Sequence, residues 1–313
     1  MESELLFINS TDYLNRETVE GKMKVLITGS NGFIAQSIIE SEWFRDQELY
    51  GLDLGENRTS GLVKYYQIDI SKPFAIEETF DVIIHLAALN RTHVDTDYAY
   101  DIFQKINVDG AKHVARSCSY HKFIFLSTTT VYGRETDEVD ELSALHPMGD
   151  YAISKASAEK ELQGIIPDEK LVILRTVNVI GAKQKKIALI PIFFEKTMNN
   201  EPITIFVPKK RTMQLLDVSD LIYAFHQVIE VDAHGIFNLA TKDYYSLEEV
   251  AQKIVEITRS SSEIRIENHD VERRVIIHAD KARNELHWEP SKTIPEVLCS
   301  YFKMVKRDGD SNS

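Results

Sequence analysis

Short apolar segments alternate with amphipathic segments through residues 24–175. Lys24–Thr28 is a brief apolar run that ends at a glycine-rich turn, which indicates a strand buried in a parallel sheet. The segment after this turn carries apolar residues at helical spacing. On the same reasoning we predict strands at Lys24–Thr28, Leu49–Leu54, Lys64–Ile70, Asp81–Leu86, Phe123–Ser127 and Leu171–Leu174, and helices at Phe33–Phe44, Tyr98–Ser119 and Tyr151–Gln163.

This alternation of strands and helices predicts one fold class. Parallel strands need a crossover between them, and such crossovers are right-handed, so few other arrangements remain. We therefore predict an α/β fold with a Rossmann-type doubly wound parallel sheet.

The pattern becomes less regular after Arg175. Ser246 and Glu249 have the spacing of a capping box, which predicts that a helix begins at Leu247. The other elements expected here are strands at Ile203–Phe206 and Gly235–Leu239 and helices at Ile187–Asn199, Val218–Val231, Leu247–Arg259 and Ile294–Lys306. We expect these elements to form a smaller mixed α/β lobe that binds the substrate.

We divide the chain into four parts on this basis. They are an N-terminal extension (1–22), a cofactor-binding domain (23–174 plus about 213–239), a substrate-binding lobe (about 175–212 plus 240–306) and a flexible tail (307–313).

Composition argues against several classes of protein. Hydrophobic residues make up 43% of the chain, yet no apolar run approaches the ~20 residues that span a bilayer. The formal net charge of -13 disfavours nucleic acid as a partner. Two cysteines form neither a disulfide framework nor a metal cage, and residues 1–22 lack the pattern of a signal peptide, so we expect a cytoplasmic protein without a metal site. Basic residues that offer a local anion site are Lys183, Lys185, Lys186, Lys209, Lys210 and Arg211, although each is more often a solvated surface charge.

The turn after the first predicted strand has the features of a dinucleotide site. Gly29 allows a tight turn, and Gly32 lets the backbone approach a pyrophosphate at the start of the next helix. Asp53 ends the second predicted strand, where a carboxylate accepts hydrogen bonds from a ribose diol and repels a 2′-phosphate. The turn and the acid together favour NAD over NADP. An ordinary strand-to-helix turn and a polar strand end remain the alternative interpretation.

A second group of residues indicates proton transfer. Tyr151 and Lys155 are four apart on a predicted helix, which puts both side chains on one face. We expect the ammonium group, and a positively charged nicotinamide ring, to lower the pKa of the phenol. The pair alone is weak, but the hydroxyl-rich segment Ser127–Gly133 directly follows the fifth predicted strand. Chemistry in a doubly wound sheet gathers at such strand ends.

These segments, in this order, resemble the extended short-chain dehydrogenases, the NAD-dependent epimerase/dehydratase family. The resemblance rests on Gly29–Ala35, Asp53, His85–Ala88, Asn107, Ser127–Gly133, Tyr151–Lys155, Arg175–Gly181, Asp217–Leu221, Gly235–Ala240 and Leu286–Pro290, and it covers about residues 22–306. The joint match is specific for the family, although no single motif is.

The resemblance implies roles for particular residues. It makes Tyr151 the general acid/base, Lys155 its partner and Thr128 the catalytic hydroxyl. The cofactor-binding residues that it implies are Gly29, Asn31, Gly32, Phe33, Ile34, Asp53, Asp69, Ile70, Leu86, Ala87, Ala88, Asn107, Tyr151 and Lys155. The substrate-binding residues are Asn90, Thr128, Thr129, Asn178 and Arg211, with Arg91 and Thr92 in the same loop as Asn90.

The resemblance also narrows the reaction. Dehydratases of the family carry an Asp-Glu pair where this chain has Thr129 and Thr130, and a hydroxyl does not readily replace a carboxylate in proton transfer. No cysteine follows the Ser/Thr segment, which disfavours 3,5-epimerisation. The remaining prediction is a nucleotide-sugar 4-epimerase, with an NAD-dependent dehydrogenase or a 4-ketoreductase of a nucleotide sugar as the alternative. Met213 stands where many members have a diphosphate-binding arginine, and Arg211 lies two residues earlier.

Two other classes and the oligomeric state stay open at this point. A non-catalytic dinucleotide sensor typically lacks the tyrosine and lysine that this chain keeps. A reductase of a small lipid or phenolic ketone would prefer NADP, which Asp53 disfavours. The resemblance further implies a homodimer that forms through the two helices predicted at Tyr98–Ser119 and Tyr151–Gln163.

Overall fold

The computed structural model describes residues 22–90, 99–134, 137–181, 183–184, 188–206, 212–267 and 275–310. Nearly all of the predicted N-terminal extension lies outside these ranges, as do Arg91, Thr92 and Arg211. Within them, no helix is long and apolar enough to cross a membrane.

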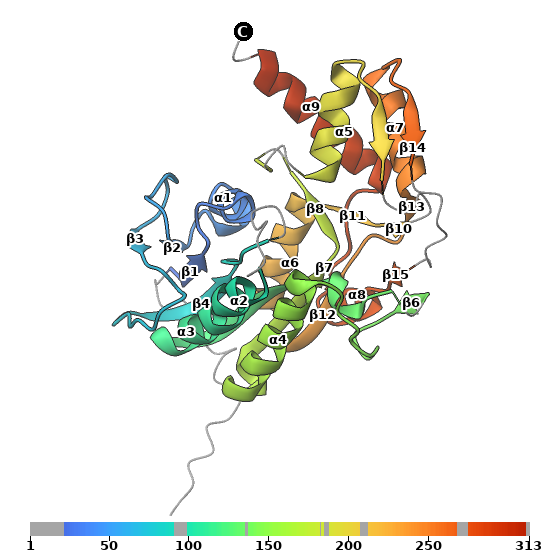
Figure 1. The fold of residues 1–313 in the computed structure, drawn as a ribbon. Helices are drawn as coiled ribbons and strands as arrows, with labels where there is room; N and C mark the ends of the chain where they lie inside the picture. Colours follow the sequence, from blue (N-terminus) through green and yellow to red (C-terminus); the bar gives the residue numbers. More distant parts are fainter. Residues whose placement is uncertain are drawn as a thin grey trace, which may run out of the picture.

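A sheet of seven parallel strands forms the centre of the fold (Figure 1). Its strands are β1 (Lys24–Thr28), β2 (Glu48–Asp53), β3 (Lys64–Gln67), β4 (Thr79–His85), β5 (Ser119–Thr128), β7 (Leu171–Thr176) and β12 (Gly235–Leu239), in the spatial order β12-β7-β5-β4-β1-β2-β3. The first three strands extend the sheet in one direction, and β4 then returns to the other side of β1. The predicted doubly wound sheet is confirmed, and its switch point lies between β1 and β4.

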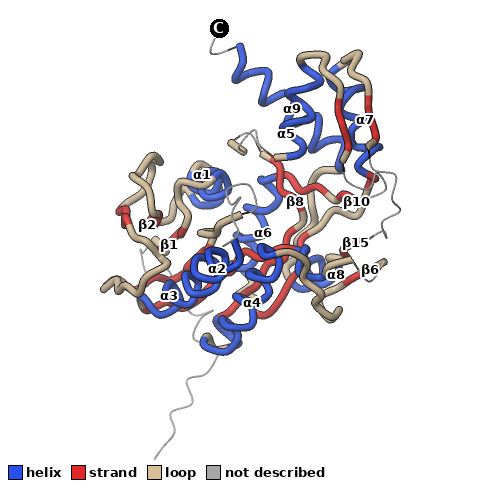
Figure 2. Tube along the Cα trace, in the orientation of Figure 1, coloured by secondary structure: helices blue, strands red, loops and turns tan. Residues whose placement is uncertain are grey.

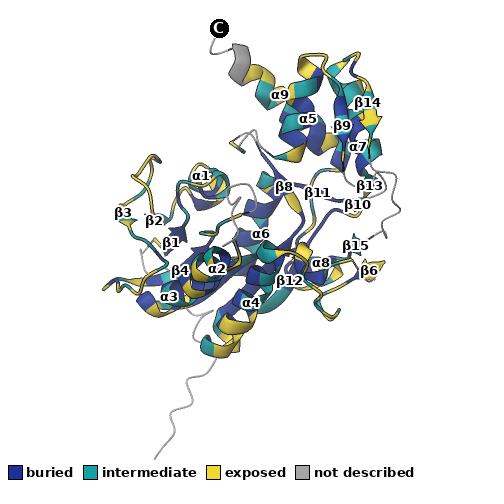
Figure 3. Cartoon of the chain, viewed as in Figure 1, coloured by how far each residue is buried: buried dark blue, intermediate teal, exposed yellow. Residues whose placement is uncertain are grey.

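Helices cover both faces of this sheet (Figures 1 and 2). Side chains such as Ile27 and Ile84 face α1 (Phe33–Ile39) and α6 (Val218–Glu230) in one buried cluster. Alternate positions such as Leu26 and Phe125 belong to a second cluster with α3 (Gly110–Ser117) and α4 (Asp150–Ile165). Both faces of the central strands are therefore buried, which explains why these strands are continuously apolar in sequence, whereas the edge strand β3 is partly exposed (Figure 3). Dimerisation through α3 and α4 stays a prediction for light scattering to test.

Two predicted helices are shorter than expected. The helix expected to reach Phe44 ends at Ile39, because the backbone N–H and hydroxyl of Ser41 both bond to the carbonyl of Ile38 and a separate 3-10 turn, η1 (Glu42–Phe44), follows. The helix expected over 98–119 divides into α2 (Ala99–Phe103), a π-helical turn η3 (Gln104–Asp109) and α3. Ser119 already belongs to β5, where it pairs with Thr79.

The second lobe gathers around a third buried cluster at the upper right of Figure 1. Its helices are α5 (Leu189–Met198), α7 (Leu247–Thr258) and α9 (Ile294–Asp310). Its short strands are β8 (Asn178–Ile180), β9 (Ile203–Ile205), β10 (Thr212–Met213), β11 (Leu215–Asp217), β13 (Tyr245–Ser246) and β14 (Ile264–Ile266). The sequence pattern predicted only β9 among these strands, because segments of two or three residues are too short to show a period.

Two expectations about the helices of this lobe have different outcomes. The capping box is confirmed, since Ser246 Oγ accepts the Glu249 N–H at 3.2 Å and Glu249 Oε2 accepts the Ser246 N–H at 2.7 Å. The last helix was predicted to end at Lys306, but α9 continues to Asp310. No proline is present there to remove a backbone donor, so the helix extends past its apolar stripe.

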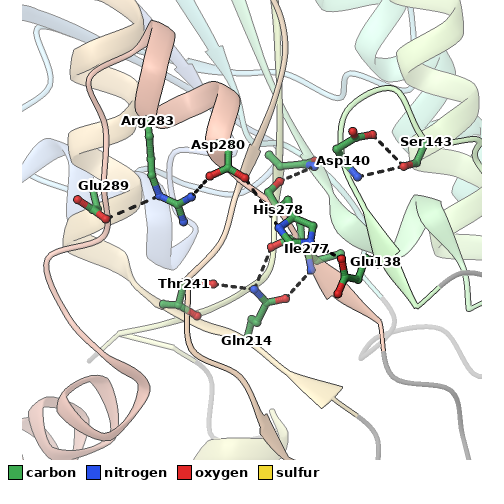
Figure 4. Close-up of polar contacts among 11 residues, drawn as sticks. Glu138, Asp140, Ser143, Gln214, Thr241, Ile277, His278, Asp280, Arg283 and Glu289 are labelled. Carbon is green, nitrogen blue, oxygen red and sulfur yellow. Dashed lines mark hydrogen bonds and ion pairs between the residues drawn. The ribbon is translucent and has the colours of Figure 1, made fainter.

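A polar junction connects the second lobe to the sheet (Figure 4). The amide of buried Gln214 bonds to the backbone N–H and C=O of Ile277 and to the carbonyl of Thr241. Ile277 lies in β15 (Ile276–Ile277), which pairs with β6 (Glu138–Val139), and α8 (Asp280–Glu285) follows. Trp288 and neighbouring apolar residues then pack in the same cluster as β1 and β4. The chain therefore returns from the second lobe to the sheet before α9 begins.

Candidate active site

The predicted site residues gather along the carboxyl edge of the central sheet. Thr28, Asp53, His85 and Thr128 are the last residues of β1, β2, β4 and β5. All four lie at one edge because the strands are parallel. Ligands of doubly wound sheets bind at this edge, beside the switch point.

Gly29 and Ala87 meet across the switch point. Gly29 has a φ of +70°, and a Cβ placed on it would lie 2.9 Å from the backbone N and Cα of Ala87. Only glycine accepts both this conformation and this approach without strain. The same residue also donates its backbone N–H to the carbonyl of Leu52 at 2.7 Å. The turn is therefore held between the ends of β2 and β4.

The hydroxyl of Thr28 fixes this approach. Its oxygen accepts the backbone N–H groups of Leu86 and Ala87, each at 3.2 Å. Both lone pairs are then occupied, so its hydrogen points to Nδ1 of His85 at 2.8 Å. His85 is therefore neutral, with its own proton on Nε2. Burial, and secondarily the charge of Lys155, lower the pKa of this imidazole to about 3.

Asp53 and Asn31 connect the glycine-rich turn to the loop after β2. Asp53 accepts the Asn31 N–H at 3.0 Å and the Gly55 N–H at 3.2 Å. The Asn31 amide in turn donates to the carbonyl of Glu56 at 2.8 Å and accepts the Arg58 N–H at 3.2 Å. Each carboxylate oxygen of Asp53 keeps a lone pair, because an ionised carboxylate has about four acceptor positions. A ribose diol can use these positions.

Asp69 and Ile70 lie beyond the end of β3, near the N-terminus of α3. Ile70 is buried, and its Cδ1 would lie 2.8 Å from a Cβ on Gly110, so the glycine lets the helix pack closely against this side chain. Asp69 is partly exposed, and hydrogen bonds from Ser71 lower the pKa of its carboxyl group. The pair thus offers an apolar surface with an adjacent acceptor.

Asn107 lies in the π-helical turn and is buried. Its amide donates to the carbonyl of Leu89 at 3.0 Å and to Ser154 Oγ at 2.9 Å, while its oxygen accepts the Leu89 N–H at 2.8 Å. The sequence predicted a cofactor contact here. In the structure the side chain joins the segment after β4 to α4, the helix of Tyr151, and the cofactor contact stays a prediction. A π turn is often found where a helix positions a functional group.

Tyr151 and Lys155 occupy the first turns of α4. Burial raises the pKa of the Tyr151 phenol to about 12, and burial also lowers the pKa of Lys155 to about 7, although Glu159 opposes that second shift. The expected lowering of the phenol pKa by Lys155 is therefore absent from this structure. The Lys155 ammonium instead lies 3.9 Å from the ring centroid of Phe125. The phenol ring packs edge-on against Phe103.

Glu159, which raises the pKa of Lys155, is itself paired with Arg175 in a buried salt bridge. Arg175 on β7 holds the Glu159 carboxylate with both Nε and Nη2, the shortest contact being 2.6 Å. Arg175 Nη1 also donates to the Tyr132 hydroxyl, which donates to Asn238 Oδ1 at 2.7 Å. Sequence reasoning placed Arg175 only within a family motif. The sequence signal that could have identified Arg175 is a charged residue near the end of an otherwise apolar strand.

Thr128 ends β5 and begins the 3-10 turn η4 (Thr129–Tyr132), against which α4 packs. Its Oγ1 accepts the backbone N–H of Thr130 at 3.2 Å and lies 3.1 Å from the Thr130 hydroxyl. Thr129 is partly exposed and Thr130 is exposed. The turn therefore presents hydroxyl groups, not carboxylates, beside the N-terminal part of α4.

The predicted substrate residues are less completely placed. Asn90 and Asn178 are exposed near the same edge, whereas Arg211 lies outside the described residues. Met213 is buried in the core of the second lobe. Phe33 lies so close to Gly181 that a Cβ on the glycine would be 2.8 Å from the ring, which brings the start of α1 beside the end of β8.

A surface groove of about 690 Å³ lies elsewhere, along β6 and α8. Acidic residues dominate its lining, and no predicted site residue is among them. Across the described ranges, no group of three His, Cys, Asp or Glu side chains is placed to hold a metal ion. We therefore locate the candidate active site at the switch point, not in this groove.

The model of the NAD dependent epimerase/dehydratase family matches residues 25–240. This chain belongs to that family. Human dTDP-D-glucose 4,6-dehydratase is 32% identical over 273 residues, which cover 78% of this chain and 77% of the human protein. The dTDP-D-glucose 4,6-dehydratase of Dictyostelium discoideum is 31% identical, and the match covers 75% of this chain but 62% of that protein. The chain thus spans about three fifths of the length of this second relative.

The fold is also similar to a solved structure. The crystal structure of UDP-glucuronic acid 4-epimerase from Bacillus cereus in complex with NAD matches with a TM-score of 0.77 at 20% identity, over 91% of this chain and 99% of that one. Family membership confirms the predicted NAD cofactor and the predicted class of enzyme.

The residues at the switch point fit NAD. A side chain at Gly29 would fill the space against Ala87, and Gly32 begins α1 without any side-chain cap. Asp53 brings a carboxylate to the position that suits a ribose diol. This arrangement supplies the close backbone approach that a pyrophosphate requires.

Replacement of Gly29 tests whether its close approach to Ala87 supports the fold and NAD binding. We expect Gly29→Ala to lower the free energy of unfolding by about 2 kcal/mol or more, because it combines a positive φ with a clash against backbone, and to reduce NAD affinity. Denaturant unfolding and calorimetric NAD titration measure both effects. Gly164→Ala, in α4 with open space around its Cβ position, is the matched control and should be neutral or stabilising. Normal stability and NAD affinity in Gly29→Ala would contradict the close approach.

His85 predicts a pH dependence of stability. Its pKa in the folded state lies below the unfolded value of 6.5, so only the unfolded chain gains a proton as the pH falls below 6.5. The contribution is complete above pH 6.5 and is lost progressively toward pH 3. From pH 7 to pH 5, the free energy of unfolding should fall by about 2 kcal/mol through this histidine. Urea unfolding at both pH values should show that His85→Asn lacks this loss, whereas exposed His121→Asn retains it. An equal loss in both variants would disprove the assignment.

Proposed function

We propose that this chain is an NAD-dependent 4-epimerase of a nucleotide-activated sugar. The observation that carries the proposal is the threonine pair Thr129 and Thr130 beside Thr128, in a site that keeps Tyr151 and Lys155. This combination supports reversible oxidation at one carbon. The names of relatives support the substrate class, since the human relative acts on dTDP-D-glucose and the Bacillus cereus neighbour on UDP-glucuronic acid.

The chain's own residues divide the work of this reaction. Tyr151, as phenolate, takes the proton of the sugar C4 hydroxyl while the C4 hydrogen leaves as hydride, so that a C4 carbonyl forms. NAD, held by the turn at Gly29 and by Asp53, would supply the hydride acceptor, and return of the hydride to the opposite face of C4 would give the epimer. Lys155, in its ammonium form, would hold the nicotinamide ribose. The Thr128 hydroxyl contacts the substrate oxygen on which charge changes.

Phenol ionisation limits this scheme in the free protein. With a pKa of about 12, Tyr151 is almost entirely protonated at pH 7. A cation placed beside it favours the phenolate. We infer that a positively charged nicotinamide ring, once bound, would supply this cation and would favour the phenolate of Tyr151. Burial, which raises the pKa of Tyr151, also lowers the pKa of Lys155, because both side chains are desolvated.

Dehydration is disfavoured although two similar relatives are dehydratases. Loss of water needs one group to remove a proton from carbon and another to protonate the departing hydroxyl. Thr129 and Thr130 supply hydroxyls of very high pKa at the two relevant positions. Glu159 is unsuitable as a replacement because Arg175 holds it in a buried ion pair.

The remaining assignments belong to the same proposal. We infer that residues 23–174 and about 213–239 bind the cofactor, and that about 175–212 and 240–306 bind the substrate, except that 277–288 pack on the sheet. Asn90, Thr129, Asn178 and Arg211 are the proposed substrate contacts. The unpaired state of Cys118 and Cys299 supports a reducing, cytoplasmic location.

A substrate panel tests the proposed activity. Purified protein with NAD is incubated with UDP-glucose, UDP-glucuronic acid and dTDP-glucose, and proton NMR identifies the products. We expect C4 epimers without a 4-keto-6-deoxy sugar. Tyr151→Phe should lower turnover by at least about 1,000-fold with NAD affinity unchanged, while Tyr223→Phe on α6 should remain active. Accumulation of a ketone would indicate a dehydrogenase instead, and a 4-keto-6-deoxy product would overturn the argument against dehydration.

Asp53 determines the predicted preference for NAD. Asp53→Asn keeps the size of the side chain but removes the charge that repels a 2′-phosphate. We expect NAD affinity to fall about tenfold and NADP affinity to stay constant or rise, as measured by calorimetry. Asp46→Asn, on the surface before β2, is the control. If both cofactors lose affinity equally, Asp53 does not select between them.

A further inference from the structure

The Thr128 hydroxyl has an unusual set of neighbours for a strand-end residue. It accepts the Thr130 N–H at 3.2 Å, and the Thr130 hydroxyl lies 3.1 Å from the same oxygen. Thr128 is 9% exposed, whereas Thr130 is exposed. Capping of η4 requires only the first of these bonds. The second bond joins two side chains and needs a separate explanation.

The donors and acceptors around Thr128 explain the hydrogen bond between the two hydroxyl groups. A hydroxyl group has one hydrogen and two lone pairs, and the Thr130 N–H occupies one lone pair of Thr128. If the Thr130 hydroxyl donates, it fills the second lone pair. The only remaining valence of Thr128 is then its own hydrogen. The exposed Thr130 oxygen keeps its lone pairs for solvent, so in this direction of donation only the Thr128 hydrogen still needs an acceptor.

We propose that Thr130 is a positioning residue that makes the Thr128 hydroxyl a hydrogen-bond donor to the substrate oxygen. The proposal rests on the proposed function, because it assumes that Tyr151 removes the proton from that oxygen. A donor is what the reaction needs there. When hydride returns to the carbonyl carbon, negative charge develops on the oxygen until the Tyr151 proton arrives, and an aimed donor stabilises that charge.

The residue at position 130 thus has a second consequence for the reaction. A carboxylate there would be an acceptor only and would draw the Thr128 hydrogen toward itself. Threonine leaves that hydrogen for the substrate. Thr130 therefore favours oxidation and reduction at one carbon in two ways, by the absence of an acid and by the direction of the Thr128 hydrogen bond.

A double-mutant cycle tests the proposal. Thr130→Val keeps the shape and the capping N–H but removes the hydroxyl, and Thr130→Ser restores it. On the nucleotide sugar that the substrate panel identifies, we expect Thr130→Val to lower kcat about tenfold with KM changed less than threefold, and Thr130→Ser to stay within twofold of the parent. In a Thr128→Val background, Thr130→Val should cause no further loss. Thr79→Val, at the opposite edge of the sheet, is the control.

Binding provides a readout without turnover. In a Tyr151→Phe background, calorimetry with UDP-glucose and UDP, and with dTDP-glucose and dTDP, compares sugar-bearing and sugar-free ligands. We expect Thr130→Val to weaken the sugar nucleotide about threefold and to leave the nucleoside diphosphate, NAD affinity and melting temperature unchanged.

The outcomes are distinguishable. Unchanged kcat in Thr130→Val, a loss that Thr130→Ser does not restore, or losses that add with Thr128→Val would each overturn the positioning role while the proposed function stands. If the parent protein converts no sugar in the panel, the proposed function fails, and this inference falls with it.

Discussion

The backbone of Gly29 passes so close to that of Ala87 that no side chain fits between them. This contact joins the ends of β1 and β4 at the point where the strand order reverses. The buried Thr28 hydroxyl maintains the contact through two backbone N–H groups and His85. The candidate cofactor site of this chain therefore depends on a glycine and on one satisfied hydroxyl group. The positions of Asp53, His85 and Thr128 at the same edge follow from the parallel sheet.

A second constraint concerns buried charge. The Arg175–Glu159 pair lies between β7 and α4, and its remaining valences are used by Ser127 and Tyr132. A buried pair of this kind adds little net stability, but the loss of one partner is costly because it leaves an unpaired charge. Its location gives it a functional consequence. Glu159 is one turn from Lys155, and its charge raises the pKa of the lysine but does not outweigh burial, which lowers it.

Family membership and reaction depend on different parts of the molecule. The cofactor turn, the sheet and the Tyr151–Lys155 pair are shared by enzymes with several activities, so they establish the family without selecting the reaction. We infer that the residues after Thr128 carry the distinction, because they decide whether an acid is present to remove or donate a proton. Similarity to dehydratases over three quarters of the chain is compatible with a different reaction for this reason.

The sequence by itself determined the sheet, most of its helices and the identity of the switch-point residues. Continuous apolar runs, a glycine-rich turn and a capping box are local signals, and burial on both faces of a parallel sheet makes them strong. Three features were decided only by the tertiary structure. The division of the helix over 99–117 depends on Asn107 reaching Leu89 and Ser154. The return of 277–288 to the sheet depends on Gln214. The pKa of Tyr151 depends on burial, not on its spacing from Lys155, because desolvation arises from every element packed around a group and no sequence interval encodes it.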